Sequence, residues 1–355
     1  MAKMNKGLLG TPTQKRKGKQ KPNQKNGTDP AKNTQSVFIT KTANQWIEQV
    51  KDLPPPKQLF SELWHEDELC ILFSDTNLGK TILAVQIGDS IARGKPIKGF
   101  DMQAEKTKVL YFDLELSTKQ FESRYKGLEG HYNFSENFQR TEINTDYIPQ
   151  GDSPDQSEKI NKDMEAEIEN SGAKVVIVDN ITWLRSNNET AKDALPLMKA
   201  LKTLKHKHNL SILALAHTPK RNESLELSKN DLAGSRMLMN FCDSSFAIGQ
   251  SNLDEGKRYL KQIKERSTYK IYGFDNIILC EVVKENNFLG FKYEKLDSEG
   301  LHLKKASEED TEERSNRIKE MYDQGKNPTE MAKELNVSRV TIYNYLKKND
   351  LTKKV

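Results

Sequence analysis

The sequence has few cysteines, few histidines and no long apolar run, and each shortage argues against a class of protein. The three cysteines among its 355 residues are Cys70, Cys242 and Cys280. No two of them have CxxC spacing and each lies among apolar residues, so we interpret them as reduced core thiols of a cytoplasmic protein. The one close pair of histidines, His206 and His208, alternates with lysines, as is typical of a solvated helix end. The sequence therefore predicts no zinc or iron site.

The lack of long apolar runs argues against a membrane protein. No run approaches the roughly 18–20 residues of a membrane-spanning helix. The N-terminus is basic, but no apolar segment follows it, so we expect no secretory signal. We expect a cytoplasmic protein without a membrane partner.

Charge is abundant and unevenly distributed. Charged residues make up 30% of the chain, hydrophobic residues only 35%, and the net charge is +5. Residues 1–35 carry nine Lys or Arg against one acidic residue, and residues 311–355 carry ten basic against seven acidic residues. The middle of the chain has a net charge of −6, so an acidic body lies between two basic ends. Residues 1–36 also have almost no apolar content, and we expect them to form a disordered basic tail.

The middle of the chain alternates between short apolar runs and longer amphipathic stretches. The apolar runs are Leu69–Phe73, Val109–Phe112, Val175–Val178 and Ile212–Ala216. Helices are predicted between them at 80–92, 117–128, 156–171 and 190–208. Each stretch is long enough for a crossover helix, so the runs should pair as a parallel sheet covered on both faces. Strand candidates near 244–249, 258–264, 277–284 and 287–293 follow closely on one another, which indicates antiparallel pairs at one edge of the sheet.

These patterns predict an α/β fold with a small all-α domain behind it. The mostly parallel sheet and its helices would occupy residues 37–296. Residues 297–313 are mostly charged and polar and form the expected linker. Residues 314–355 are predicted to form the small helical domain.

The first chemical motif lies between a predicted strand and a predicted helix. It comprises Ser74, Asp75, Thr76, Asn77, Leu78, Gly79, Lys80 and Thr81. It differs from the phosphate-binding pattern Gly-x-x-x-x-Gly-Lys-Ser/Thr only in its first position, where Ser74 stands for glycine. In such a loop, backbone N–H groups and a helix N-terminus face the anion, while the lysine reaches the terminal phosphates. The hydroxyl after the lysine binds Mg²⁺. The motif therefore predicts ATP binding, with Lys80 on the phosphates and Thr81 on Mg²⁺.

A second strand ends in a carboxylate that fits this site. The apolar run Val175–Val178 is followed directly by Asp179. Ligands of open α/β sheets collect at the carboxyl ends of the strands. There Asp179 would hold the water shell of the metal. The alternative is that it only caps the following turn.

A third strand end, in Val109–Ser117, resembles a segment of a known family. Its Asp-Leu-Glu-Leu-Ser sequence is similar to the motif of RecA-fold hexameric ATPases of the DnaB and RepA kind, in which the glutamate polarises the attacking water. The resemblance implies that Glu115 is the catalytic base. Asp113 is its rival for that role.

Further segments resemble the same family in order and spacing. Residues Ser211–Lys220 are similar to the RepA-type strand that ends in a histidine reporting on the γ-phosphate, which implies that role for His217. Residues Asp231–Asp243 resemble the segment after the family's mobile loop. Lys264 and Arg266 resemble the pair that reaches into the neighbouring subunit's nucleotide as an arginine finger.

This resemblance covers residues 60–295 and is closest to the RepA-like ATPases of plasmid replication. It implies a RecA-like P-loop NTPase fold. It also implies a homo-oligomeric ring, usually a hexamer, with nucleotide at the subunit interfaces.

The C-terminal segment resembles the helix-turn-helix of resolvases and related DNA-binding proteins. Gly325 would end a first helix, Pro328 would begin a second, and Ser338 would cap a third that lies in the major groove of DNA. The residues predicted to face DNA are Ser338, Arg339, Val340, Thr341, Asn344 and Lys347. From position 336 onward there are five basic residues and one acidic residue, as a phosphate-facing surface requires. A three-helix protein-binding module is the alternative.

Together these features predict a DNA-associated ATPase that uses ATP and Mg²⁺. Combined with the resemblance, they suggest a helicase or translocase in the replication or mobilisation of a plasmid or other mobile element. Its partners would be DNA, further copies of the chain and other replication or mobilisation proteins. The alternative is an ATP-switched protein that binds a DNA site without unwinding it. A motor needs pore loops that grip the strand, and residues 218–231 carry Lys220, Arg221 and Lys229 but are also rich in Glu and Ser.

Overall fold

The computed structural model describes most of the chain. The described residues are 38–128, 130–147, 154–182, 184, 191–219, 221–232, 235–304, 308–335, 337–349 and 351. The basic segment 1–36, which we predicted to be a disordered tail, lies outside them.

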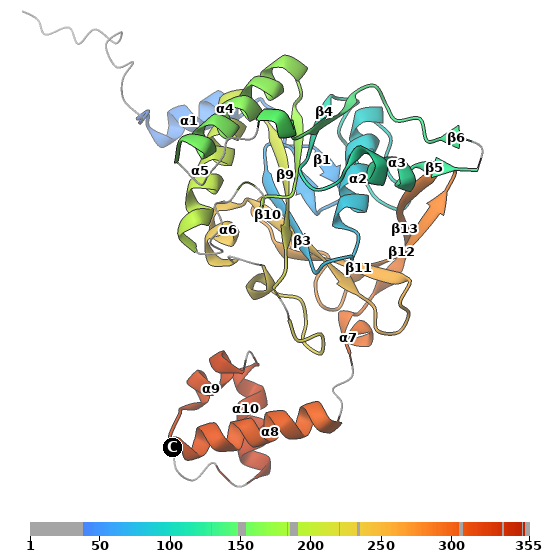
Figure 1. Cartoon of the computed structure of the whole chain (residues 1–355). Helices are drawn as coiled ribbons and strands as arrows, with labels where there is room; N and C mark the ends of the chain where they lie inside the picture. Colours follow the sequence, from blue (N-terminus) through green and yellow to red (C-terminus); the bar gives the residue numbers. More distant parts are fainter. Residues whose placement is uncertain are drawn as a thin grey trace, which may run out of the picture. The chain divides into compact units, whose positions relative to one another are not determined.

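A nine-stranded sheet forms the centre of the described chain (Figure 1). Its order is β13-β12-β11-β10-β3-β9-β8-β4-β7. The strands are β3 (Leu69–Ser74), β4 (Val109–Asp113), β7 (Phe138–Glu142), β8 (Val175–Asp179), β9 (Ser211–His217), β10 (Ser244–Gln250), β11 (Lys257–Lys264), β12 (Ile277–Glu285) and β13 (Phe288–Asp297). The strands from β10 to β7 in this order pair in parallel, whereas β11, β12 and β13 pair antiparallel at one edge. The mostly parallel α/β sheet and its antiparallel edge, both predicted from the sequence, are confirmed.

Helices cover both faces of the sheet, with α2 and α3 on one side and α4, α5 and α6 on the other (Figure 1). These five are α2 (Lys80–Arg93), α3 (Thr118–Arg124), α4 (Pro154–Ser171), α5 (Ala191–His208) and α6 (Ser235–Phe241). The remaining short elements before the C-terminal helices are α1 (Ala43–Val50), β1 (Gln58–Phe60), β2 (Trp64–His65), β5 (Lys126–Gly127), β6 (Gly130–His131), the 3₁₀ helices η2 (Thr145–Tyr147) and η3 (Lys229–Asp231), and α7 (Glu299–His302). Among the described residues, no helix is both long and apolar enough to cross a membrane.

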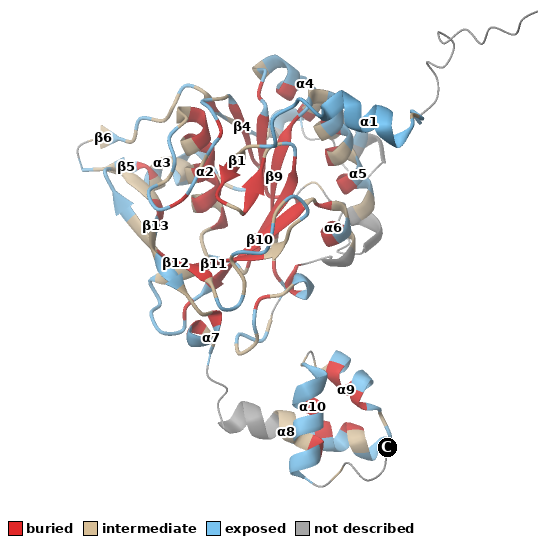
Figure 2. Cartoon of the chain, turned by 180° about the vertical axis from the view of Figure 1, so that it is seen from behind, coloured by how far each residue is buried: buried red, intermediate tan, exposed pale blue. Residues whose placement is uncertain are grey.

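The core explains why central strands such as β3 and β8 are apolar almost throughout. Successive side chains of a strand point to opposite faces of the sheet. Leu69, Ile71 and Phe73 of β3 pack in one apolar cluster, with residues of α4 and α5, while Cys70 and Leu72 pack in the other, with residues of α2. Figure 2 shows the buried residues concentrated on the central strands. A strand covered on both faces therefore needs an unbroken apolar run.

Two parts of the structure differ from the sequence interpretation. We missed β7, which pairs in parallel with β4 at the end of the sheet. Its sequence, FQRTE, is polar because an edge strand is only partly covered. The expected linker at 297–313 carries structure at both ends, because β13 extends to Asp297, α7 follows it, and the next helix begins at Glu308.

The N-terminal unit, up to Pro54, is separate from the rest of the chain. Its helix α1 begins with a capping box, in which the side chain of Thr42 accepts from the amide of Gln45 and the side chain of Gln45 accepts from the amide of Thr42. None of the residues of α1 is buried.

Three C-terminal helices form a small unit with its own core. They are α8 (Glu308–Asp323), α9 (Pro328–Glu334) and α10 (Arg339–Lys348). The buried residues of this core are Ile318, Met321, Met331, Ala332, Ile342 and Leu346. Asn327 caps α9 with Pro328 in its first turn, and the Ser338 hydroxyl accepts from the amide of Thr341 at the start of α10. Pro328 and Ser338 are the local signals that predicted the starts of α9 and α10.

Candidate nucleotide-binding site

The predicted phosphate loop connects β3 to α2. Gly79 lies at the N-cap of α2 with φ of 94°, and no side-chain hydrogen bond caps this helix. The first amides of α2 are therefore left to an external acceptor, which is the geometry that binds anions. Only glycine fits here, because the backbone is left-handed and a Cβ would lie 3.0 Å from the ring of Phe291. Asn77 also has a positive φ, of 63°.

The side chain of Lys80 folds back across this loop. Its ammonium donates to the carbonyl oxygens of Ser74 and Asp75, both at 3.0 Å, and approaches the Ser74 hydroxyl at 3.3 Å. Burial lowers the pKa of Lys80, while the negative charge of Asp179 opposes that shift. The loop thus holds a buried cation beside exposed helix-terminal amides, as a site for a phosphate chain requires.

Asp179 ends β8 as a fully buried carboxylate. Its Oδ2 accepts from the Tyr111 hydroxyl at 2.6 Å. Its Oδ1 is also buried and has no hydrogen-bond partner among the described residues. Burial raises the pKa of Asp179 to about 6, while hydrogen bonds from Thr81 and Tyr111 act in the opposite direction. A buried oxygen without a partner, next to the Thr81 hydroxyl, fits the donor set of a hydrated Mg²⁺ ion.

Removal of the Asp179 charge is expected to stabilise the nucleotide-free protein. The pKa of Asp179 rises from 3.8 to about 6 on folding, so the cost of its buried charge is fully present above pH 6 and is lost as the pH falls toward 4. Asp179→Asn keeps an acceptor for Tyr111, and we expect it to be roughly 1–3 kcal/mol more stable than the wild type at pH 8. Urea unfolding with a chelator present measures the difference, which should vanish near pH 4. The exposed substitution Asp275→Asn is the control, and an equal gain at both pH values would contradict the expectation.

Four residues from separate elements form a polar chain at this edge of the sheet. His217, at the end of β9, lies with its Nδ1 3.3 Å from Nζ of Lys80 and its Nε2 3.3 Å from Oε1 of Glu115. The Asn180 side-chain amide, which follows β8, donates to the same carboxylate. An ammonium can only donate, so Nδ1 accepts from Lys80. The Nε2 of His217 also lies 2.9 Å from the side-chain nitrogen of Asn180, so it contacts both Asn180 and Glu115. The chain connects the phosphate loop to Glu115 through one histidine.

The electrostatics keep Glu115 ionised. The hydrogen bond from His217 lowers the pKa of Glu115, burial opposes the shift, and the charge of Lys80 contributes further lowering. The Glu115 side chain is 39% exposed, so solvent reaches it. An ionised carboxylate that is open to water is able to orient an attacking water molecule.

Asp113, the rival candidate, is committed to other contacts. Its Oδ2 accepts from Arg140 Nε at 2.8 Å, and its Oδ1 accepts from the amide of Leu116 at 2.9 Å. Its side chain has no exposed area. Asp113 therefore shapes the turn that carries Glu115, and Glu115 is the carboxylate left facing the phosphate loop.

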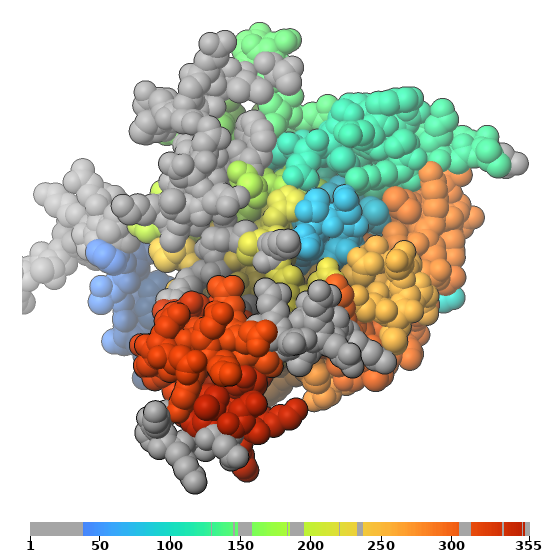
Figure 3. Space-filling model, turned by 60° about the horizontal axis from the view of Figure 1, so that its bottom comes forward, coloured from blue at the N-terminus to red at the C-terminus, as the bar shows by residue number. Residues whose placement is uncertain are grey.

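Strand order brings these residues together. β9 lies between β3 and β8, and β4 follows β8, so the carboxyl ends of four parallel strands are adjacent. Ser74 pairs with His217 in register, and Asp113 pairs with Asp179. In Figure 3 the light-blue atoms around residue 80 lie between teal and yellow segments that are distant in the chain.

Sequence reasoning missed Asn180, Tyr111 and Arg140. Asn180 directly follows Asp179 at a strand end, through a cis peptide bond, and its position at that edge was the available signal. Tyr111 lies within an apolar strand and gave none. Arg140 lies on β7, which the sequence interpretation did not include.

Lys264 lies away from the phosphate loop of its own chain. β11 is antiparallel to β10, and Lys264 pairs with Ser245 of β10. Ser245 in turn pairs with Ile71 of β3, three residues before Ser74, where the phosphate loop starts. Its ammonium donates to the carbonyls of Met239 and Cys242 at the end of α6. Burial lowers the pKa of Lys264.

Arg266 lies beyond the end of β11, on the side where β3 begins. It donates to Asp243 Oδ1 at 3.2 Å and to the carbonyl of Asn240 at 3.3 Å. The other carboxylate oxygen of Asp243 accepts from the amide of Leu69, the first residue of β3. The phosphate loop follows the opposite end of β3. The Arg266 side chain is 51% exposed and is not brought into the site of its own chain.

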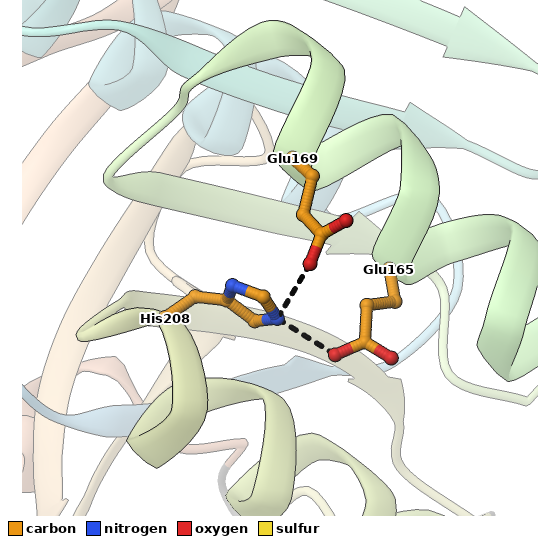
Figure 4. Close-up of side chains that lie close together, drawn as sticks. All are labelled: Glu165, Glu169 and His208. Atoms are coloured by element: carbon orange, nitrogen blue, oxygen red, sulfur yellow. Dashed lines mark hydrogen bonds and ion pairs between the residues drawn. The ribbon is translucent and has the colours of Figure 1, made fainter.

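A second group of potential ligands connects α4 to the end of α5 (Figure 4). Glu165, Glu169 and His208 have ligand atoms within 4.8 Å of one another, the one such group among the residues described. Oε1 of Glu165 lies 2.7 Å from Nε2 of His208, and Oε1 of Glu169 lies 3.8 Å from the same nitrogen. Because both carboxylates converge on one nitrogen, the arrangement is that of an ion-paired histidine. His208 is thus less solvated than the sequence suggested.

The residues predicted to face DNA lie on one surface of the C-terminal unit. The exposed set is Ser338, Arg339, Val340, Thr341, Asn344 and Lys347. Ile342 and Leu346, on the opposite side of α10, are buried. The hydroxyls of Ser338 and Thr341 lie 2.9 Å apart, so part of this polar surface is already paired.

Comparison with known proteins agrees with this geometry. The phosphate loop, its lysine and the carboxylate at the end of β8 define a P-loop ATPase. Residues 37–223, more than half of the chain, match the AAA domain family, and the chain belongs to that family. Residues 302–349 are similar to the helix-turn-helix domain of resolvase. No curated protein sequence matches the chain.

Solved structures also resemble the chain. One is the KaiC-like protein PH0186 from the hyperthermophilic archaea Pyrococcus horikoshii OT3. The similarity covers 64% of this chain and 91% of that protein, at a TM-score of 0.43 and 13% identity.

Proposed function

We propose that this protein hydrolyses ATP with Mg²⁺ as a ring oligomer bound to DNA, and that it acts as a RepA-like helicase or translocase of a plasmid or other mobile element. The observation that supports this best is the series of side-chain contacts from Lys80 through His217 to Glu115. It places a phosphate-binding cation and an ionised, solvent-accessible carboxylate at the two ends of one polar connection.

In this proposal each residue at the sheet edge has one role. Lys80 and the first amides of α2 bind the β- and γ-phosphates of ATP, and Glu115 orients the water that attacks in line. Thr81 and Asp179 hold Mg²⁺, which when bound neutralises charge on the phosphates. His217 senses the γ-phosphate because it contacts both Lys80 and Glu115.

The two proposed activities are assigned to separate parts of the sequence. We assign residues 37–296 to the ATPase domain and 314–355 to the DNA-binding domain, with 297–313 between them. The exposed face of α10 supports DNA binding, since a recognition helix presents polar and basic side chains to the major groove. In this view Arg339, Asn344 and Lys347 approach bases or phosphates.

Replacement of Arg339 is expected to weaken DNA binding without affecting hydrolysis. Arg339 is the first residue of α10 and is exposed, so its loss removes a contact to a base or phosphate. Arg339→Ala should reduce affinity for the preferred duplex by about 1–3 kcal/mol. Fluorescence anisotropy at several salt concentrations measures this, with Lys319→Ala on α8 as the control. Equal affinities of both variants would contradict the assignment of α10.

A second candidate function is supported by the segment that a motor would use to grip DNA. Arg221 donates to Asp231 and to the carbonyl of Leu225, and Leu227 is buried. Much of the segment 218–231 is therefore packed into its own domain. Lys220 lies outside the described residues. This packing favours an ATP-switched protein that binds a DNA site without unwinding it.

A strand-displacement assay separates the two functions. A motor should release a labelled strand in an ATP-dependent reaction that Lys80→Ala abolishes. An ATP-switched protein should release none, while ATP still changes its affinity for the DNA site. A wild type that neither hydrolyses ATP nor changes its affinity for DNA when ATP is present would contradict both.

A further inference from the structure

A buried ion pair joins three segments that are far apart in the sequence. Lys261, in the middle of β11, donates to Glu299 Oε2 at 2.5 Å and to the carbonyl of Leu227 at 2.8 Å. The Oε1 of Glu299 accepts from the amide of Leu227 at 2.7 Å and from the Tyr259 hydroxyl at 3.1 Å. We call Lys261, Glu299 and Leu227 the buried junction. It fixes the loop before α6 and the helix α7 to the same strand.

The junction is deeply buried, so its parts depend on one another. The Lys261 side chain is 2% exposed and that of Glu299 has no exposed area. Removal of Glu299 would leave the buried ammonium of Lys261 with the largely exposed Glu226, at 2.7 Å, as its carboxylate partner, whereas replacement of both buried partners by apolar residues is often tolerated. The arrangement of the three segments therefore depends on both buried charges.

One side of the junction borders the phosphate loop. A cavity of about 250 Å³ is lined by Asp75, Thr76 and Leu78 of that loop and, across from them, by Arg221 and Leu227. The loop that carries Arg221 and Leu227 begins directly after β9, whose last residue is His217. The loop that carries Arg221 and Leu227 is thus connected to the nucleotide site in two ways. It lines a cavity together with the phosphate loop, and it follows His217 in the chain.

The other side of the junction holds α7, after which the chain leads to the C-terminal unit. We call the residues between α7 and α8 the tether. Glu299 begins α7, and His302 ends it, with its Nδ1 2.8 Å from the Ser251 hydroxyl. Two residues later, the amide of Lys304 donates to the carbonyl of Glu223 at 3.2 Å. The next helix in the chain is α8, the first of the C-terminal unit. The first part of the tether is thus hydrogen-bonded, through Lys304 and Glu223, to the loop that lines the cavity beside the phosphate loop.

We propose that Lys261 and Glu299 are positioning residues that couple nucleotide occupancy of the phosphate loop to the tether of the helix-turn-helix. Nucleotide binding stabilises the packed arrangement of the loop 221–231 from the side of the cavity. Through the buried junction, this stabilisation extends to α7 and to the hydrogen bond between Lys304 and Glu223. Coupling is reciprocal, so DNA bound by α10 strengthens nucleotide binding by the same factor. This inference rests on the proposed ATPase and DNA-binding activities.

Limited proteolysis of the full chain tests the coupling at the tether itself. Trypsin cleaves after Lys304 or the adjacent Lys305, and a non-hydrolysable ATP analogue should slow cleavage at this pair at least about fivefold in the wild type. The first variant, Glu299→Gln, removes the buried partner of Lys261 and leaves it with the largely exposed Glu226. The second, Lys261→Met with Glu299→Met, removes both charges and protects against a failure to fold. Glu285→Gln, which breaks the exposed pair with Lys292, is the matched control.

The expected result is that both junction variants bind the analogue like the wild type but lose its protection of Lys304. The same variants should lose the effect of the analogue on affinity for duplex DNA, while Glu285→Gln keeps both effects. Equal protection in the double variant would overturn the proposal, as would a wild type that binds the analogue without protection of Lys304. A wild type that does not bind the analogue would contradict the proposed function itself.

Discussion

Replacement of Lys80 by alanine is expected to lower the rate of ATP hydrolysis about 10²–10³-fold, because it removes the cation that meets the charge developing on the γ-phosphate. In the structure this ammonium is buried and burial lowers its pKa, so its charge does not stabilise the nucleotide-free fold. It is held over the loop by two carbonyl oxygens rather than by a carboxylate. A negatively charged phosphate is a better partner than these carbonyls, so the side chain is free to move onto it.

Hydrolysis rates at saturating ATP measure the effect. Lys98→Ala, which removes an exposed lysine after α2, is the matched control and should retain the wild-type rate. Thermal unfolding should show that Lys80→Ala is no less stable than the wild type. A variant with near-normal hydrolysis would contradict the assignment of the loop as the phosphate site.

Local signals predicted the fold well because they determine its elements. β3 and β8 are unbroken apolar runs, and only a strand covered on both faces requires that pattern. Pro328 and the cap at Ser338 likewise predicted the starts of two C-terminal helices. The polar edge strand β7 has no such pattern. It is held in the sheet by backbone hydrogen bonds to β4, which leave no signal in its side chains.

The site was predictable where a local motif marks it. The phosphate-loop motif and Asp179 each follow an apolar strand, so the sequence placed them at the carboxyl ends of strands, whereas Glu115 and His217 were predicted from a family resemblance. The contact between His217 and Glu115 joins residues 102 positions apart and depends on strand order, which no local pattern gives. Lys261 and Glu299 were missed for a related reason. Charged residues are ordinarily exposed, and nothing in the sequence shows that these two are buried together.

Replacement of Arg266 by alanine is expected to lower hydrolysis about 10³–10⁵-fold, the range known for an arginine finger supplied from outside the active site. The reason is positional. Arg266 lies beyond the carboxyl end of the antiparallel strand β11, on the side where β3 begins, whereas the phosphate loop follows the end of β3. It is half-exposed and bound to Asp243, so it is not part of the phosphate site of its own chain. If it acts in catalysis, it must act on a neighbouring subunit.

Subunit mixing makes that requirement testable. Arg266→Ala subunits keep an intact phosphate loop, and Lys80→Ala subunits keep an intact Arg266. In a head-to-tail ring, an equal mixture of the two inactive variants forms complete sites at about a quarter of its interfaces and should regain a corresponding fraction of the wild-type rate. Lys270→Ala, which removes an exposed cation four residues away, should hydrolyse ATP normally and gain nothing from mixing. Inactive mixtures, or an Arg266→Ala protein with full activity, would contradict the trans role. Restored hydrolysis follows only if the two faces of one subunit serve two different nucleotides, because neither variant contains a complete site within its own chain.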